Sequence, residues 1–459
     1  MPDSKPASAA PPSPPRQNRG WLGNRTWASC WAVVAAFGAY ACMYGLRKPF
    51  TAATYEAEGM AAGLGTGFKA WLVTAQVLGY TLSKIVGIKV IAEMPPARRA
   101  LSLLALVGIA EGALLLFAVT PIPWNSAWLF LNGLALGMVF GLVLGFLEGR
   151  RLTEALIAGL CASFILADGV AKSVGAYLLK TGVTELWMPA VAGGLFLLPL
   201  GGFVWMLRAI PPPSAEDVEA RSERMPMTRR ERRALFRRFA PGLVAIALTY
   251  LLVTILRSIR ADFAPELWRT LGLTGQPGIF ARSEFWVALG VTASNGLLVL
   301  IRDNRRAFFL SLGISAGGLG MVAVALLGLD RGVCGPFAFM VLLGLGMYLP
   351  YVAVHTTIFE RLLAMTRQQG NLGFLMYVAD ATGYLGYVAL MLGRQLWPGI
   401  WPESGNLMAF FKLTAWLVAG ASLIALAFAA IWFFRHPATR PDPGPASQGP
   451  VSLAPDSAV

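Results

Sequence analysis

The chain has 459 residues, of which 56% are hydrophobic and 14% are charged, and its mean hydropathy is +0.60. A chain this apolar is not a soluble enzyme, and its long apolar runs predict a polytopic helical membrane protein. The formal net charge of +14 does not indicate nucleic-acid binding, because the basic residues form short clusters between apolar runs, without a basic stripe and interleaved aromatics.

The sequence lacks the motifs of enzymes and metal proteins. Its four cysteines have neither CxxC spacing nor histidine companions, and the chain has only two histidines. No Walker sequence, nucleophile elbow or metal-binding helix motif occurs. We therefore expect no enzyme activity, no metal and no cofactor.

Both ends of the chain, residues 1–25 and 435–459, are rich in Pro, Ser and Ala, which predicts two disordered tails. The first tail has no apolar core, so it is not a signal peptide. Between the tails, apolar stretches of about 20 residues predict twelve transmembrane helices. They cover roughly residues 26–54, 67–91, 99–119, 125–148, 153–180, 187–209, 240–261, 278–301, 307–328, 333–360, 370–393 and 406–434.

A polar linker over residues 210–239 divides the spans into six and six, and its second part is strongly basic. Other clusters of basic residues lie on the same side of the membrane as this linker and both tails, whereas the opposite loops carry few. This distribution places both termini in the cytoplasm. The excess of Arg over Lys and the short loops favour a bacterial inner membrane.

Two six-helix halves with parallel topology predict the major facilitator fold, an all-α membrane protein with pseudo-symmetric bundles at 26–209 and 240–434. In this layout the substrate binds between the halves. The first and seventh spans are then symmetry mates, and a Leu-Arg dipeptide recurs in them at 46–47 and 256–257.

Arg47 lies 22 residues beyond Arg25, which is about 33 Å along a helix. At that depth it either snorkels to the far surface together with Lys48 or faces a central pore. The spacing alone does not decide between these two roles.

Arg257 lies 16 residues past Pro241, about 24 Å into an apolar core of about 30 Å. A guanidinium at this depth needs a partner, which favours a substrate-facing role over a structural ion pair. Asp262 could also pair locally with Arg257 or Arg260.

Two other spans carry charged residues at helical spacing. Tyr80 and Lys84 share one face of the second span, and a lysine at that depth must find an anion. Asp168 and Lys172 are four residues apart in the fifth span. They form either a self-satisfied structural pair or a gating or coupling pair.

Asp380 in the eleventh span has no cationic neighbour on its own helix. It therefore either meets a cation from another span or titrates, which makes it the best candidate for proton coupling. His355 in the tenth span, which follows Tyr348, is either a hydrogen-bonded packing residue or a proton relay.

Four short patches resemble the organophosphate:phosphate antiporter branch of the major facilitator superfamily, which includes the glycerol-3-phosphate and hexose-phosphate exchangers. They are Tyr44-x-x-Arg47-Lys48-x-Phe50, Tyr80-x-x-Ser83-Lys84, Leu256-Arg257 followed by Asp262-Phe263-Ala264-Pro265, and Tyr348-Leu349-Pro350 with Gly383-Tyr384-Leu385-Gly386.

The resemblance implies that Arg47 and Arg257 hold phosphate and that Lys84 lines the same site. Tyr44, Tyr80, Tyr348 and His355 are further candidate substrate contacts. The fifth span departs from the exchangers, because it offers Asp168 and Lys172 where they supply a histidine. The chain also resembles an uncharacterised bacterial transporter-like family, which leaves the substrate open.

We therefore expect a monomeric alternating-access carrier, embedded in the lipid bilayer, that exchanges a small anion such as phosphate, an organophosphate or a carboxylate. One alternative is a proton-coupled symporter of an organic anion or zwitterion, which loads its proton at Asp380 or at the Asp168 and Lys172 pair. Arg260 and Asp262 complete the coupling or gating candidates. The other alternative is a non-transporting ligand sensor on the same fold.

Overall fold

A computed structural model describes residues 25–92, 94–147, 153–210, 229–366, 372–397 and 407–439. The predicted disordered tails and the predicted linker lie largely outside these ranges. The last part of the predicted linker is helical, because α10 (Arg229–Asp262) begins there and continues into the seventh span.

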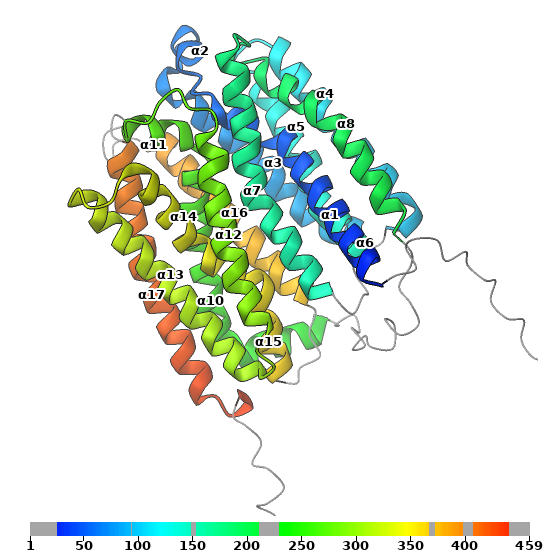
Figure 1. The fold of residues 1–459 in the computed structure, drawn as a ribbon, viewed down its shortest axis with the longest axis vertical. Coiled ribbons are helices and arrows are strands. Elements are labelled where there is room, and N and C mark those ends of the chain that lie inside the picture. Colours follow the sequence, from blue (N-terminus) through cyan, green and yellow to red (C-terminus); the bar gives the residue numbers. More distant parts are fainter. Residues whose placement is uncertain are drawn as a thin grey trace, which may run out of the picture.

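The first half of the fold is a bundle of long helices joined by short connections (Figure 1). Its helices are α1 (Arg25–Arg47), α3 (Phe68–Ala92), α4 (Pro96–Val119), α5 (Ser126–Leu136), α6 (Val139–Leu147), α7 (Thr153–Lys180) and α8 (Met188–Arg208). The connection between α1 and α3 holds the short helices η2 (Pro49–Ala52), α2 (Glu56–Ala61) and η3 (Gly65–Gly67).

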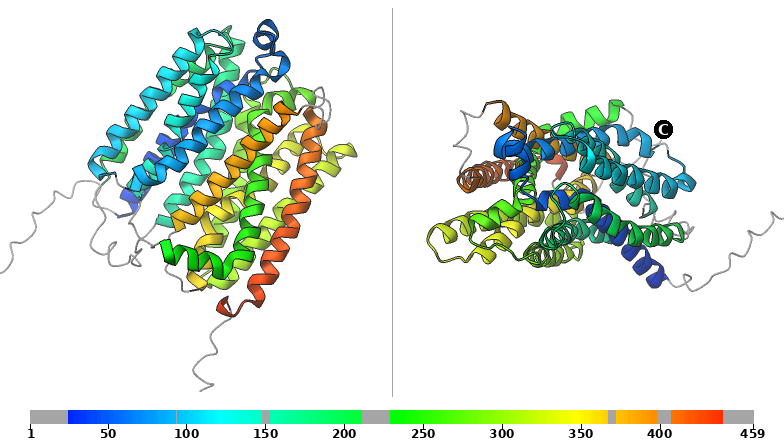
Figure 2. Two further views of the ribbon diagram at one scale, coloured as in Figure 1. Left: turned by 180° about the vertical axis from the view of Figure 1, so that it is seen from behind. Right: turned by 90° about the horizontal axis from the view of Figure 1, so that it is seen from above.

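The second half repeats this arrangement. Its helices are α10, α11 (Ala264–Thr270), α12 (Ile279–Val299), α13 (Asn304–Asp330), α14 (Pro336–Ala353), α15 (Phe359–Met365), α16 (Leu372–Leu396) and α17 (Leu407–Arg435). A π-helical turn, η4 (Val354–Ile358), joins α14 to α15, and η6 (Pro437–Thr439) follows α17. Figure 2 shows the two bundles side by side from behind and from above.

Besides the seventh span, three predicted spans differ clearly from the observed helices. The first span ends at Arg47 rather than continuing to residue 54, because Pro49 cannot extend the α-helix and a short 3₁₀ turn follows. The fourth span is divided into α5 and α6. The tenth span continues through the π-helical turn into α15.

Two helix pairs form most of the contact between the halves: α7 packs against α12, and α3 packs against α16. Figure 1 shows α7, α12 and α16 between the outer helices of the two bundles. Among the described residues, eight helical stretches are long and apolar enough to cross a membrane, and none of them belongs to these four helices. The four contact helices carry buried charged residues, which include Lys84, Asp168, Glu284 and Asp380.

Small residues bring α3 and α5 into backbone contact. A Cβ atom on Gly133 would lie 2.0 Å from the Gln76 carbonyl oxygen, and one on Gly79 would lie 2.0 Å from the Phe130 carbonyl oxygen. Only glycine allows so close an approach. This contact fixes α3, which carries Tyr80 and Lys84, against its neighbour.

Hereafter we call the side of the fold where α1 begins and α17 ends the tail side. The opposite side, where α1 ends, is the far side.

Candidate functional site

Two buried arginines, one from each half, approach the same tyrosine ring. Arg47 is the last residue of α1 and Arg257 belongs to α10, and their exposed fractions are 3% and 7%. Their guanidinium carbons lie 6.0 Å and 5.9 Å from the centroid of the Tyr384 ring on α16. Arg257 also donates a hydrogen bond from Nη2 to the Tyr384 hydroxyl at 3.3 Å. Tyr384 therefore connects the two arginines across the interface.

Aromatic rings surround both guanidinium groups. The Arg47 guanidinium carbon lies 3.6 Å from the centroid of Tyr80, and that of Arg257 lies 4.5 Å from the centroid of Tyr351. In the part of the chain that the structure describes, neither arginine forms an ion pair with a carboxylate, and both Nε atoms are buried without a hydrogen-bond partner. Ring faces stabilise a cation but accept few of its N–H donors. The guanidinium N–H groups of Arg47 and Arg257 are therefore available to donate hydrogen bonds to an oxyanion.

Lys84 has a different environment, because its ammonium group is paired with Asp380 of the other half. The Lys84 ammonium group donates a hydrogen bond to the Asp380 carboxylate, and both side chains are buried. The ammonium also lies 5.2 Å from the ring centroid of Tyr384 and 5.3 Å from that of Tyr80. Lys84 thus borders the arginine site with its charge already compensated.

Asp380 is the centre of a hydrogen-bond network within the second half. Its carboxylate accepts a hydrogen bond from the Tyr250 hydroxyl and lies 3.3 Å from His355 Nε2. His355 Nε2 is also 2.8 Å from the Tyr250 hydroxyl, while its Nδ1 is buried without a partner among the described residues. Of the two alternatives that the sequence left open for Asp380, the structure therefore shows the cation from another span.

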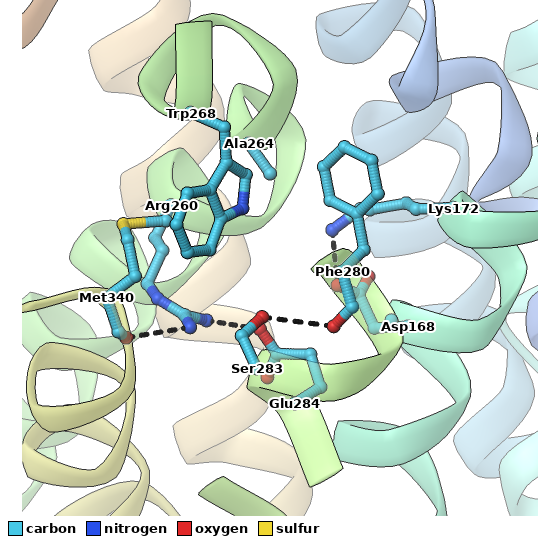
Figure 3. Close-up of a pocket in the computed structure, with 10 residues that line it drawn as sticks. Asp168, Lys172, Arg260, Ala264, Trp268, Phe280, Ser283, Glu284 and Met340 are labelled. Carbon is cyan, nitrogen blue, oxygen red and sulfur yellow. Dashed lines mark hydrogen bonds and ion pairs between the residues drawn. The ribbon is translucent and has the colours of Figure 1, made fainter. Parts of the chain in front are cut away.

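A second group of buried charges lies where α7 meets α12. Asp168 and Lys172 hydrogen-bond to each other on α7, as their spacing predicted. Arg260 on α10 donates to Glu284 on α12 at 2.6 Å and to the Met340 carbonyl oxygen at 3.0 Å. Figure 3 shows these side chains around one cavity, which we call the seam cavity.

Ion pairs connect the halves on the far side. Lys48, just after α1, pairs with Asp262 at 2.5 Å, and the Tyr387 hydroxyl donates to the same carboxylate at 3.0 Å. Lys69 at the start of α3 pairs with Glu266 on α11 at 2.6 Å. These contacts hold the far ends of α1, α3 and α10 together.

In a more exposed part of the far side, two glutamates of α2, Glu56 and Glu58, contact other segments. Glu56 pairs with Arg269 of the other half at 2.6 Å, and this hydrogen bond lowers the pKa of the Glu56 carboxyl. Burial, together with a hydrogen bond to the Glu58 carboxyl, raises the pKa of Glu185 to about 7. Glu185 also accepts a hydrogen bond from the Thr54 backbone N–H at 3.3 Å.

Two amide side chains hold the C-terminal end of α1. Gln76 donates to the Arg47 carbonyl oxygen at 3.0 Å, and Asn132 donates to the Leu46 carbonyl oxygen at 3.2 Å. Gln76 also donates to Asn132 Oδ1 at 2.8 Å. The last carbonyl groups of a helix have no partners within it, so these bonds satisfy buried acceptors. They also fix the position from which the Arg47 side chain extends.

The structure therefore brings most of the sequence candidates to the interface. Tyr44 lies 5.9 Å from the Arg47 guanidinium carbon, and Tyr348 lies 6.0 Å from that of Arg257. The local pairing considered for Asp262 does not occur, because Lys48 reaches it from the other half while Arg260 turns toward Glu284.

Sequence reasoning did not select several interface residues as site residues, among them Lys48, Tyr250, Glu284, Tyr351 and Tyr384. Lys48 and Glu284 were detectable as charges inside or beside apolar runs. The three tyrosines carry no such signal, because tyrosine is also common in packed helix contacts.

Comparison with known proteins places the chain in a family. The family of unknown function DUF5690 matches residues 49–436, which include every interface residue described above except Tyr44, Arg47 and Lys48. The chain belongs to DUF5690. A comparison with curated proteins finds no significant match.

Solved structures show the fold of this DUF5690 chain. A crystal structure of a D-xylose-proton symporter is 13% identical, with a TM-score of 0.58, and the match covers 88% of this chain and 97% of that chain. A mutant peptide transporter in complex with sulfate is 15% identical, with a TM-score of 0.58 and coverage of 90% and 96%. A bacterial homolog of the human lysosomal transporter Spinster, in an inward-facing and unoccupied conformation, is 13% identical, with a TM-score of 0.58 and coverage of 92% and 100%.

These similarities confirm the predicted all-α major facilitator fold. They do not single out the organophosphate:phosphate antiporter branch.

Proposed function

We propose that this DUF5690 chain is a secondary transporter that exchanges small anions by alternating access, with Arg47 and Arg257 binding the anion from opposite halves. The observation that carries the proposal is the pair of buried guanidinium groups that have aromatic rings, but no carboxylate, as neighbours among the described residues. The resemblance to phosphate exchangers and the shared fold of solved transporters support the same function.

The charges of the site favour phosphate, an organophosphate or a carboxylate as substrate. Arg47 and Arg257 contribute two positive charges, whereas the charge of Lys84 is compensated by Asp380. Guanidinium groups bind phosphate and carboxylate oxygens through paired N–H donors. An anion with two negative charges would therefore neutralise the site.

The same charges favour exchange over one-way transport. A carrier that reorients without substrate must keep two uncompensated guanidinium groups in a low-dielectric interior, at a cost of several kcal/mol. An anion that contacts both arginines removes this cost and draws the two halves together. Loaded carriers should therefore change state much faster than unloaded ones.

The test is transport in reconstituted vesicles. Vesicles preloaded with phosphate should take up labelled phosphate much faster than vesicles without phosphate inside, and Arg47→Gln and Arg257→Gln should each abolish the uptake. Arg282→Gln is a matched control, because Arg282 also lies near an aromatic ring, Phe337 at 5.8 Å, but is exposed. Equal uptake into loaded and unloaded vesicles would contradict exchange.

A binding screen identifies the substrate class. Phosphate, sugar phosphates, dicarboxylates and amino acids are added to the purified protein, and thermal unfolding is measured. The anions that bind should raise the unfolding temperature of the wild type and of Arg282→Gln, but not of Arg47→Gln or Arg257→Gln. Unchanged ligand shifts in both arginine variants would show that the anion binds elsewhere.

The competing functions receive less support. The symporter hypothesis relied partly on titration of Asp380, whose carboxylate is instead held by Lys84 and Tyr250. A sensor on the same fold would signal through the basic linker, of which residues 211–228 lie outside the described ranges. From the distribution of basic residues we further propose that both termini are cytoplasmic, and from the excess of Arg over Lys and the short loops that the protein lies in a bacterial inner membrane. Because one chain supplies both halves of the site, we propose that it acts as a monomer.

A further inference from the structure

Aromatic side chains fill the contact that α17 makes with α10 and α13 on the tail side. The buried ring of Phe433 on α17 lies 5.2 Å from Phe308 on α13 and 6.4 Å from Phe239 on α10, measured between ring centroids. Phe434 packs against Phe309 of α13 at 5.9 Å. Figure 1 shows α13 and α17 as neighbours at the outside of the second half. The ends of these helices therefore carry an aromatic cluster.

Arg305, in the first turn of α13, lies at the edge of this aromatic cluster. Its guanidinium carbon is 5.2 Å from the ring centroid of Phe434 and 5.6 Å from that of Phe309. Its Nε atom is buried without a hydrogen-bond partner, and no described carboxylate forms an ion pair with it. Asp303 instead caps α13, where it accepts a hydrogen bond from the Arg306 backbone N–H at 2.7 Å. Ring faces stabilise a cation but accept few of its N–H donors, so Arg305 can donate to an added anion.

The corresponding helix of the first half shows a contrast. α4 and α13 are the third long spans of their halves, and Arg99 lies in the first turn of α4. Arg99 donates a hydrogen bond to the carbonyl oxygen of Gly145 on α6. A Cβ atom on Gly145 would lie 3.0 Å from the Arg99 guanidinium carbon, so Arg99 is used within its own bundle. Arg305 has no such acceptor among the described residues.

Other cationic groups lie around the same end of α17. Arg435, its last residue, is exposed, and the guanidinium carbon of Arg238 on α10 lies 5.5 Å from the ring centroid of Phe239. Neither arginine forms an ion pair with a described carboxylate. Partial burial, together with the charge of Arg238, lowers the pKa of the His436 imidazole. The end of α17 is thus a region of positive charge, which attracts anions.

The surface next to these charges is apolar. Leu310 of α13 and Ile431 of α17 are exposed, and the exposed fraction of Phe434 is 62%. Both helices are long and apolar enough to cross a membrane, so their exposed side chains face acyl chains. Their tail-side ends lie at the level of the lipid headgroups. This combination suits a ligand with an anionic head and apolar chains, rather than a free anion in water.

We propose that Arg305 binds the phosphate group of an acidic phospholipid at the tail-side ends of α13 and α17, with the acyl chains against the exposed apolar side chains of these helices. Its guanidinium group donates hydrogen bonds to the phosphate oxygens while the rings of Phe309 and Phe434 support its face. The nearby arginines repel the ammonium group of a zwitterionic lipid, so the site prefers a lipid with net negative charge. The site contains neither Arg47 nor Arg257 and does not depend on the proposed anion exchange.

The test is native mass spectrometry of the purified full-length protein, titrated with phosphatidylglycerol or with phosphatidylcholine of the same acyl chains. The wild type should bind its first phosphatidylglycerol about tenfold more tightly than its first phosphatidylcholine. Arg305→Gln should weaken the binding of phosphatidylglycerol about fivefold and leave that of phosphatidylcholine unchanged. Equal affinities of the wild type for the two lipids would overturn the proposal.

Two further variants separate the site from general surface charge and from misfolding. Arg306→Gln is the matched control, because it removes the same charge from the next residue, which is exposed and contacts neither ring of the site. It should weaken the binding of phosphatidylglycerol less than twofold. Arg305→Lys keeps the charge and should retain most of the lipid preference. Equal losses in Arg305→Gln and Arg306→Gln would overturn the proposal, as would a loss in Arg305→Lys as large as that in Arg305→Gln.

Inorganic phosphate distinguishes a lipid site from a site for a free anion. The rise in unfolding temperature that phosphate causes should be the same in Arg305→Gln as in the wild type. If this rise is lost in Arg305→Gln, the residue binds a soluble anion and the lipid proposal is refuted. If phosphate has no effect on either protein while the lipid preference depends on Arg305, the proposed anion exchange fails and the lipid site stands.

Discussion

Replacement of Asp380 by Asn should destabilise the protein and, at the same time, increase its affinity for phosphate. The substitution removes the only carboxylate that pairs with Lys84 among the described residues, and leaves a buried ammonium group with an amide neighbour. Breaking a buried ion pair from one side costs about 3–5 kcal/mol. Lys84 borders the proposed anion site at Tyr384, so a bound anion can replace the lost counter-charge. One added charge-assisted hydrogen bond of about 1.5–3 kcal/mol corresponds to roughly ten- to a hundredfold tighter binding.

The assay is thermal and chemical unfolding of the purified protein, repeated over a range of phosphate concentrations. Asp330→Asn is a suitable control, because Asp330 pairs with Lys412 at 2.5 Å on the exposed far side, where an ion pair contributes about 1 kcal/mol or less. The double variant Lys84→Gln with Asp380→Asn should recover much of the stability and lose the gain in affinity. The reasoning is refuted if Asp380→Asn is no less stable than Asp330→Asn, or if its affinity for phosphate does not rise.

Three further outcomes follow from other contacts. Asn132→Leu should cost about 1–3 kcal/mol of unfolding free energy, because it leaves buried carbonyl groups without donors, and it should also weaken phosphate binding through Arg47. Asn125→Leu is its control, since the buried Asn125 side chain makes no hydrogen bond with the described residues, and equal effects would contradict a positioning role. Arg269→Gln should change the unfolding free energy by less than about 1 kcal/mol, because its pair with Glu56 is exposed, and a larger loss would show that this contact holds the far side closed. The raised pKa of Glu185, about 7, means that folding favours the protonated carboxyl, so the unfolding temperature should fall as the pH rises through 7 and Glu185→Gln should remove that dependence. An unchanged pH dependence in Glu185→Gln would assign it to another group.

The sequence predicted the fold well, because the twelve apolar runs and the basic clusters are local signals that the bilayer imposes on any polytopic chain. The division of the fourth span into α5 and α6 was not visible, since no proline interrupts residues 126–147. Within the site, the Asp168 and Lys172 pair was predictable because both residues lie on one helix face.

Other parts of the site were not predictable, because they depend on how distant helices rotate toward each other. Lys84 and Asp380 are 296 positions apart, and no pattern in either helix identifies the partner. The same holds for Tyr384, which touches both arginines only because α16 packs beside α3 and α10. From the sequence we could predict that each buried charge needs a partner, but not which side chain is that partner.

The charged residues buried in α3, α7, α12 and α16 have a consequence for how the protein is made. A charged side chain at the centre of a helix opposes insertion into the bilayer by about 2.5–3.5 kcal/mol. Lys84 and Asp380 lie on helices from different halves, so neither loses this penalty until the second half has been synthesised and has docked. We therefore expect these helices to insert together with their neighbours rather than one by one. Biogenesis of the first half alone would leave it with charges that only the second half can neutralise.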